Sequence, residues 1–335
     1  MNFNQLFDEF EKLKVLILGD SMLDAYFYGK VSRISPEAPV PIVNLVHKEH
    51  RLGGAANVAL NIKALGAEPI LCTLKGNDRD GETIKQLLRE NKMSIDGLIN
   101  DYNRGTTVKT RIIGNNHQML RIDEEETQEI DSNVESLIFE AVKHFINKVD
   151  VVIMQDYNKG LLTASLIKNV VELCNKKGVK TVVDPKFKNF FEYKNVSLFK
   201  PNRKEMAQAY NKARLDKTSE VRKLASDLRE SLNADSVLTT LSEDGALIVN
   251  RSESIHFPAH PRKVVDVSGA GDSALSAAAL CVALDTPSRV TAEIANLAGG
   301  LVCEQVGVVP VDRDSLLDQV LELGINEGLY RTDNR

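Results

Sequence analysis

Cysteine is scarce in this chain, with four residues among 335. Cys72, Cys174, Cys281 and Cys303 are far apart and form no CxxC pair or other metal-ligand spacing. This argues against a disulfide framework and a zinc site, and predicts reduced thiols in the core of a cytoplasmic protein. The six histidines are equally scattered, which gives no further reason to expect a metal centre.

Long basic runs and long apolar runs are also missing. Asp and Glu exceed Lys and Arg by 47 to 42, and no basic run marks a nucleic-acid footprint. No stretch reaches the roughly 18 uninterrupted apolar residues that cross a bilayer. The N-terminal MNFNQLFDEFEKLK lacks the basic start and apolar core of a signal peptide and predicts a packing helix. We therefore expect small-molecule partners or a second copy of the chain, with no nucleic acid and no membrane.

The apolar pattern predicts an α/β fold. Residues 14–18 read as a buried strand, and from about residue 130 apolar runs at 149–154 and 179–183 alternate with helical patterns such as 164–176. Such alternation is typical of parallel βαβ units. Because no repeat, low-complexity tract or linker interrupts the chain, we expect one domain over residues 1–335, with a mainly parallel central sheet flanked by helices.

Two segments, at about 25–50 and 104–123, differ from this pattern. They are aromatic or β-branched and partly alternating, with the Pro-rich stretch 35–39 in the first and the turn sequence GNNH at 114–117 in the second. These features predict short strands outside the main sheet. We expect the two segments to form a small, discontinuous β-strand lid.

The stretch 264–284, VVDVSGAGDSALSAAALCVAL, predicts an anion-binding loop. We expect a strand ending in Val264-Val265, and then Gly269, Ala270 and Gly271, whose N–H groups can converge on an anion at the start of a helix. Asp272 beside that anion is typical of a base that takes a proton from a hydroxyl attacking a phosphate. From these residues alone, an ordinary helix N-cap is an equally good interpretation.

Other polar residues follow predicted strand ends, where ligands of open α/β sheets bind. Carboxylate and amide groups in the early loops suit vicinal hydroxyls, although two adjacent glycines are equally compatible with a plain helix start. Lid cations could hold a second phosphate or be ordinary solvated charges, and the polar groups after the strands at 149–154 and 179–183 could be surface polarity. Asn202 and Glu205 suit phosphate and hydrated Mg²⁺, or a capping box. The early-loop residues are Asp20, Asp24, Gly53, Gly54 and Asn57, the cations are Arg104, Lys109, Arg111 and Arg121, and the strand-end residues are Asp156, Lys159, Asp184 and Lys186.

Taken together, these motifs resemble the PfkB (ribokinase-like) family of carbohydrate kinases over nearly the whole chain. The matching regions are GGAAN at 53–57, DVSGAGD at 266–272 and the NxxE motif at 202–205. The resemblance implies a ribokinase-like fold and an ATP-dependent sugar kinase that uses Mg²⁺, and it leaves a monovalent-cation requirement open. It also implies a homodimer formed through the lid strands.

Within the family, RISPEAPVP at 33–41, TTVKTR at 106–111 and DYNKG at 156–160 resemble the D-glycero-β-D-manno-heptose 7-phosphate kinases of ADP-heptose and lipopolysaccharide core synthesis. Departures from that pattern are Gln155, Lys200 and Leu241. Because no HxGH-type nucleotidyltransferase motif is present, we expect phosphorylation only. A kinase for ribose, fructose or a fructose phosphate, and a catalytically silent sugar or nucleotide sensor, are the alternatives; a redox dinucleotide protein lacks its GxGxxG.

The resemblance also implies roles for individual residues. Asp272 is expected to be the general base, with Gly269, Ala270 and Gly271 binding the transferred phosphoryl group. The expected substrate-binding residues are Asp24, Arg33, Gly53, Gly54, Asn57, Lys109, Arg111, Arg121, Asp156 and Lys159, and the expected nucleotide-binding residues are Lys186, Asn202, Ser242, Gly245 and Asn296, with Glu205 for the metal.

Overall fold

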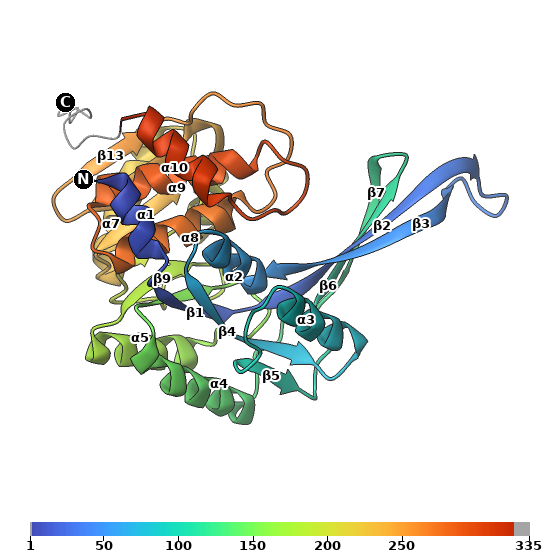
Figure 1. Ribbon diagram of the computed structural model, residues 1–335, viewed down its shortest axis with the longest axis horizontal. Coiled ribbons are helices and arrows are strands. Elements are labelled where there is room, and N and C mark those ends of the chain that lie inside the picture. The colour runs from blue at the N-terminus through green and yellow to red at the C-terminus, as the bar shows by residue number, and fades with distance from the viewer. Residues whose placement is uncertain (1, 325–335) are drawn as a thin grey trace.

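The computed structural model describes residues 2–324, which form a helix-flanked body with a projecting arm (Figure 1). The body contains a nine-stranded sheet in the order β13-β12-β11-β10-β9-β8-β1-β4-β5, parallel from β11 to β5 and antiparallel at β12 and β13. The predicted mainly parallel sheet is therefore confirmed. Its strands are β1 (Lys14–Gly19), β4 (Glu68–Gly76), β5 (Leu98–Asp101), β8 (Val151–Gln155), β9 (Lys180–Asp184), β10 (Leu198–Phe199), β11 (Ser236–Thr240), β12 (Ala246–Asn250) and β13 (Ser254–Phe257).

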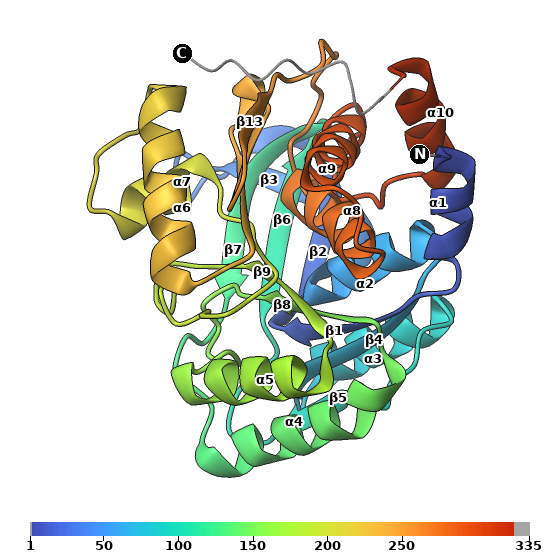
Figure 2. The same ribbon diagram turned by 90° about the vertical axis from the view of Figure 1, so that its left-hand side faces the viewer.

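Helices cover both faces of this sheet, as the turned view shows (Figure 2). Because successive side chains of a strand point to opposite faces, Val15 and Ile17 join one apolar core while Leu16 and Leu18 join the other. The first core is completed by α1 (Phe3–Phe10), α2 (Ala55–Ala64), α3 (Arg79–Glu90), α8 (Ala270–Ala283), α9 (Ser288–Val302) and α10 (Arg313–Glu322). The second is completed by α4 (Ser132–Phe145), α5 (Ala164–Lys177), α6 (Arg203–Ala209) and α7 (Thr218–Leu232), with short 3-10 turns η1 (Ile146–Lys148) and η2 (Ser242–Asp244) between elements.

The arm in Figure 1 is the expected lid. It is a four-stranded sheet in the order β3-β2-β6-β7, built from β2 (Ser21–Ile34), β3 (Pro41–Gly54), β6 (Val108–Gly114) and β7 (His117–Glu124). The strands β2/β3 and β6/β7 are antiparallel, whereas the two central strands β2 and β6 are parallel. The lid therefore joins two chain segments that are far apart in the sequence.

Some expectations were wrong or incomplete. No strand ends in Val264-Val265, because β13 ends at Phe257 and is followed by Pro258 and Pro261, which cannot donate to a ladder. The two valines are instead 61% and 49% exposed. The sequence patterns also did not predict α7, β5, β10 or β13. The predicted single domain covers residues 1–335, and residue 1 and residues 325–335 lie outside the described residues. Within residues 2–324, no helix is long and apolar enough to span a membrane.

Candidate active site

Asp272 lies at the third position of α8, with its carboxylate aimed at groups from other elements. Gly269 is the N-cap residue, with φ 83°, and no side chain caps the helix. The Asp272 carboxylate accepts hydrogen bonds from Asn57 Nδ2 at 2.7 Å and from the Tyr157 hydroxyl at 2.9 Å. Asp272 is thus not used as an N-cap, and its two oxygens are held by α2 and by the loop after β8.

The surroundings of Asp272 make it a stronger base than an exposed carboxylate. Burial raises its pKa to about 6, and Asp184 acts in the same direction. The hydrogen bonds from Asn57 and Tyr157 and the charge of Lys200 oppose this increase. The group is therefore mainly ionised at neutral pH and still able to accept a proton, which is the property required of a general base.

The start of α8 has the features of an anion site. Gly269 lies in the left-handed region, and the first N–H groups of a helix have no partner within the helix. Lys200, which sequence reasoning noted only as a departure from the family pattern, lies close to this turn, since a Cβ at Gly271 would be 3.9 Å from its Nζ. Lys200 is only 2% exposed and pairs with Asp184 at 3.1 Å.

A second carboxylate, Asp24 on β2, lies at the base of the lid. It is 4% exposed and forms an ion pair with Arg111 of β6. A Cβ at Gly53 would lie 2.4 Å from Asp24 Oδ2, so a side chain there would displace the carboxylate. Gly54 has φ 61° and is the N-cap of α2, which agrees with the helix-start interpretation. Asn57 follows in the first turn of α2 and is 1% exposed.

Asp20, directly after β1, holds the loop that follows β8. Its carboxylate accepts hydrogen bonds from the backbone N–H groups of Tyr157, Lys159 and Leu161 at 2.9, 3.1 and 3.2 Å. All three donors belong to the loop after β8, so the Asp20 carboxylate holds the backbone of this loop in place. Tyr157 was not among the predicted site residues, and its only signal is its place inside the DYNKG motif.

Asp156 belongs to the same loop and is 2% exposed. It accepts hydrogen bonds from the Asn158 backbone N–H at 2.7 Å and the Tyr193 hydroxyl at 2.8 Å. Burial, followed by the nearby charge of Asp20, raises its pKa to about 6. The structure thus contains two buried carboxylates, Asp156 and Asp272, each with a tyrosine donor and a similar pKa.

The lid cations are not free solvated charges. Lys109 pairs with Asp123 at 3.0 Å and with Glu125 at 2.9 Å, and Lys159 reaches the same Glu125 at 2.8 Å. Arg121, which is half exposed, also pairs with Asp123 at 2.8 Å. A network of opposite charges therefore covers the face of the lid that carries Asp24.

Arg33 is not brought to this network within one chain. It lies nine residues beyond Asp24 on β2. At about 3.3 Å per residue, that separation is roughly 30 Å. Arg33 is exposed and is the second-last residue of β2.

The candidate nucleotide side centres on the start of α6. The Asn202 side chain accepts from the Glu205 N–H at 2.8 Å and the Glu205 carboxylate accepts from the Asn202 N–H at 2.8 Å, so the capping box is present. Glu205 also forms an ion pair with Lys186. Burial opposes the charge of Lys186, but Asp184 and Glu205 raise its pKa above the ordinary value.

The remaining predicted nucleotide residues lie near β12. Ser242 and Gly245 have φ of 57° and 89° and shape the η2 turn between β11 and β12. Asn296 is on α9, which packs against β12, and its Nδ2 donates to the Pro258 carbonyl at 3.0 Å.

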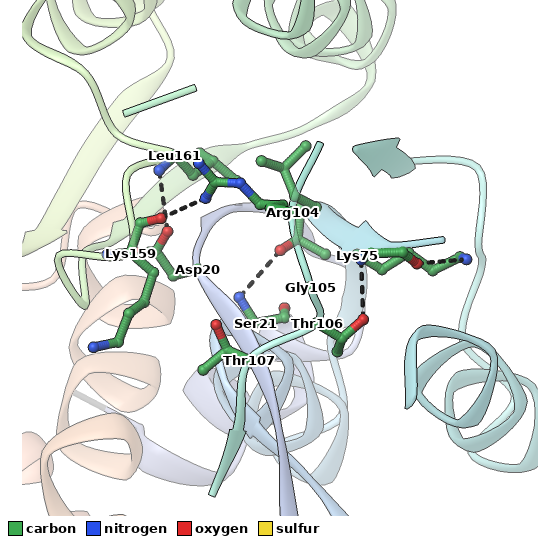
Figure 3. Close-up of a pocket in the computed structure, with 12 residues that line it drawn as sticks. Asp20, Ser21, Lys75, Arg104, Gly105, Thr106, Thr107, Lys159 and Leu161 are labelled. Atoms are coloured by element: carbon green, nitrogen blue, oxygen red, sulfur yellow. Dashed lines mark hydrogen bonds between the residues drawn. The ribbon is translucent and has the colours of Figure 1, made fainter. Parts of the chain in front are cut away.

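A small cavity at the base of the lid has a volume of about 20 Å³ (Figure 3). It lies among the residues after β1, the end of β4 and the segment that leads into β6. Arg104 is fixed beside it by Asp101 at 3.0 Å and by the carbonyls of Lys159 and Gln128. A cavity of this size holds one water molecule, so it is not the sugar site.

The geometry agrees with a comparison against known families. Residues 12–313 match the model described as pfkB family carbohydrate kinase. The chain belongs to this family. It is therefore a carbohydrate kinase, a phosphotransferase with an alcohol group as acceptor.

Most of this chain is also similar to curated relatives. The chain is 36% identical over 316 residues to "Bifunctional protein HldE" of Syntrophotalea carbinolica and 39% identical over 312 residues to the protein of that name from Desulfatibacillum aliphaticivorans. These matches cover 94% and 93% of this chain but only 64% of each relative.

Solved structures show the same fold at low sequence identity. Phosphofructokinase-2 from Escherichia coli, in complex with potassium, has a TM-score of 0.77 at 20% identity and covers 93% of this chain and 99% of its own. Arabidopsis thaliana ribokinase complexed with ribose and ATP has a TM-score of 0.71 at 17% identity, with coverage of 91% and 98%. The predicted ribokinase-like fold is confirmed.

Proposed function

We propose that this kinase transfers the γ-phosphate of ATP to the anomeric hydroxyl of D-glycero-β-D-manno-heptose 7-phosphate, giving the 1,7-bisphosphate. The observation that carries the proposal is the buried Asp272 carboxylate at the start of α8, which accepts a hydrogen bond from Asn57 of α2, the helix that directly follows lid strand β3. The sugar itself is inferred from the resemblance of the RISPEAPVP, TTVKTR and DYNKG stretches to heptose 7-phosphate kinases. The relatives named HldE are consistent with it.

In the proposed reaction, Asp272 accepts the proton of the anomeric hydroxyl. The sugar oxygen then forms a bond to the γ-phosphorus, while the bond between that phosphorus and the bridging oxygen breaks and ADP leaves. N–H groups at Gly269, Ala270 and Gly271 bind the oxygens of the transferred group. Removing one such donor typically costs about 3 kcal/mol of transition-state stabilisation. Asp24, Gly54 and Asn57 would orient the sugar hydroxyls.

Mg²⁺ fits the residues near Glu205. Burial, followed by the charge of Asp184, raises the pKa of Glu205. The carboxylates of Glu205 and Asp184 therefore interact in this region, and Lys186 and Lys200 are nearby. Mg²⁺ keeps most of its waters and is commonly held by one or two carboxylates together with substrate phosphates. Glu205 would hold the hydrated ion beside Lys186 and Asn202. The ion supplies charge neutralisation on the phosphate oxygens.

A phosphate on the substrate suits the lid cations. Lys109 and Arg111 lie two residues apart on β6 and are both ion-paired with acidic groups. A phosphate dianion carries more charge than a carboxylate and forms bidentate bonds with Arg, so it can compete for these cations. An unphosphorylated sugar offers these cations hydroxyl oxygens but no negative charge.

A substrate panel tests the proposal. The release of ADP is measured with the heptose 7-phosphate, the free heptose, ribose, fructose and fructose 6-phosphate, and the position of the new phosphate is read by ³¹P NMR. We expect the highest kcat/KM with the heptose 7-phosphate and an anomeric phosphate in the product. Turnover of unphosphorylated sugars only, or of none, would refute it.

Arg111→Met sharpens the test. It should raise the KM for the phosphorylated sugar and change the KM for ATP little. Arg313→Met is the matched control, because Arg313, the first residue of α10, pairs with Asp8 of α1 at 3.2 Å and neither helix is part of the site. Equal effects of the two variants on the KM for the sugar would contradict the proposed role of Arg111 in binding the substrate phosphate.

The face of the lid opposite the network of charges supports the homodimer as a further part of the proposal. Register places Phe27, Ile112 and Leu120 side by side on the face opposite the charges, with Ile122 two residues along. Leu120 and Ile122 are 56% and 46% exposed. We expect a dimer in sedimentation experiments that Leu120→Lys converts to a monomer. Leu137→Lys, at a 55% exposed position on α4, is the control, and a Leu120→Lys dimer would contradict the interface.

A further inference from the structure

Tyr157 has three of its groups engaged at once. Its hydroxyl donates to Asp272 Oδ1 at 2.9 Å, and its backbone N–H donates to Asp20 Oδ2 at 2.9 Å. Its ring lies 5.6 Å from Lys186 Nζ. Tyr157 therefore connects the end of β1 with the first turn of α8, on the side of the carboxylate opposite the Asn57 amide.

We propose that Tyr157 is a positioning residue for Asp272, which fixes the orientation of the carboxylate and stabilises its ionised form. The inference rests on the proposed role of Asp272 as the base. A hydrogen bond donated to a carboxylate favours the charged form, and two donors on different oxygens restrict rotation of the group. Nothing in this role requires Tyr157 to touch the substrate.

Tyr157 is suited to donate at every working pH. Burial, and then the charges of Asp272 and Asp184, raise the pKa of its phenol well above the ordinary value, so the hydroxyl stays protonated. The backbone of the residue is held by Asp20, whose carboxylate also binds the N–H groups of Lys159 and Leu161. The donor is thus fixed in place before any ligand arrives.

The balance of charge around Asp272 shows why a fixed donor matters. Asp184, at the end of β9, and burial both disfavour its ionised form. Lys200 after β10 and Lys186 after β9 favour it, and Asn57 on α2 donates to the other oxygen. Removing the Tyr157 hydroxyl takes away one of the few stabilising groups and leaves the unfavourable ones in place.

Tyr193 provides a matched control. Its hydroxyl donates to Asp156 Oδ2 at 2.8 Å, and burial raises the pKa of Asp156 to about 6, as it does for Asp272. Tyr193→Phe removes the same chemical group as Tyr157→Phe from a second buried pair. Any shift that depends on this particular donor must therefore differ between the two variants.

The first experiment needs no substrate. The carboxyl carbons of Asp are labelled with ¹³C, the Asp272 signal is assigned by its loss in Asp272→Asn, and its pH titration is followed by NMR. We expect Tyr157→Phe to raise the Asp272 pKa by about one pH unit, and Tyr193→Phe to leave it unchanged. No shift in Tyr157→Phe, or equal shifts in both variants, would overturn the inference.

The second experiment measures kcat/KM against pH with any sugar that the wild type phosphorylates. In Tyr157→Phe the acidic limb should move upward by the same amount, lowering the rate at pH 5 about tenfold, with the KM for ATP unchanged. An unmoved limb would contradict the role of Tyr157. A wild type inactive towards every sugar would refute the proposed function, and the NMR result would still decide the role of Tyr157.

Discussion

Replacing the candidate base should separate activity from stability. Asp272→Asn removes a carboxylate whose pKa burial raises from 3.8 to about 6. At 1.36 kcal/mol per pH unit, keeping this group ionised costs the folded state about 3 kcal/mol at neutral pH. The new amide can be accommodated, because the buried Asn57 Oδ1 has no hydrogen-bond partner and a flip of the Asn57 amide would present it to the NH₂ group of the new side chain.

The sign of the effect defines the assay. The folded state binds the Asp272 proton more tightly than the unfolded state, so the wild type loses stability as the pH rises from about 4 through about 6. Asp272→Asn lacks this loss, so its free energy of unfolding in urea should exceed that of the wild type by about 3 kcal/mol at pH 8 and by little at pH 4. Its kcat should fall by about 10²–10⁴. A stability difference independent of pH would refute the reasoning.

Three further substitutions have expected outcomes. Lys200→Met leaves the buried Asp184 carboxylate without its partner, so unfolding in urea should show a loss of about 3–5 kcal/mol, and an unchanged midpoint would contradict a buried ion pair. Gly53→Ala places a Cβ 2.4 Å from Asp24 Oδ2, so the KM for the sugar should rise while the KM for ATP does not. Equal changes in the two KM values would contradict a role of Asp24 in sugar binding. Gly269→Ala forces a non-glycine residue to φ 83°, at a cost of about 1–2 kcal/mol, and calorimetry should show a lower Tm, whereas an unchanged Tm would show that the loop relaxes.

Much of the fold was readable because burial produces a strong local signal. The apolar runs at β1, β8 and β9 are buried on both faces, so they stand out without reference to the rest of the chain. Val264-Val265 carried the same β-branched signal without the burial. Local composition cannot tell which valines a neighbouring helix will cover, and the prolines before them were the better guide.

The site was predictable as a set of segments and not as a set of contacts. Asn57 and Asp272 are 215 residues apart, and nothing in their spacing indicates a 2.7 Å hydrogen bond. The pairing of Lys109 with Asp123 was available only in part, because the turn at 114–117 joins β6 to β7 but a register shift between Ile112 and Ile113 brings Asp123, in place of Ile122, opposite Lys109. The ion pair between Asp184 and Lys200, by contrast, arises from neighbouring parallel strands whose order only the folded sheet defines.

The parallel pairing of β2 with β6 determines when the lid can form during folding. Each of its two hairpins is local, but their junction joins residues such as Asp24 and Lys109, with α2, β4, α3 and β5 between them in the chain. Contacts of such long sequence separation form late, after the loop-closure entropy has been offset by other contacts. The Arg111–Asp24 contact crosses this junction. Refolding followed by a probe at Arg111 should therefore lag behind a probe at α8, and catalytic competence should return with the slower of the two.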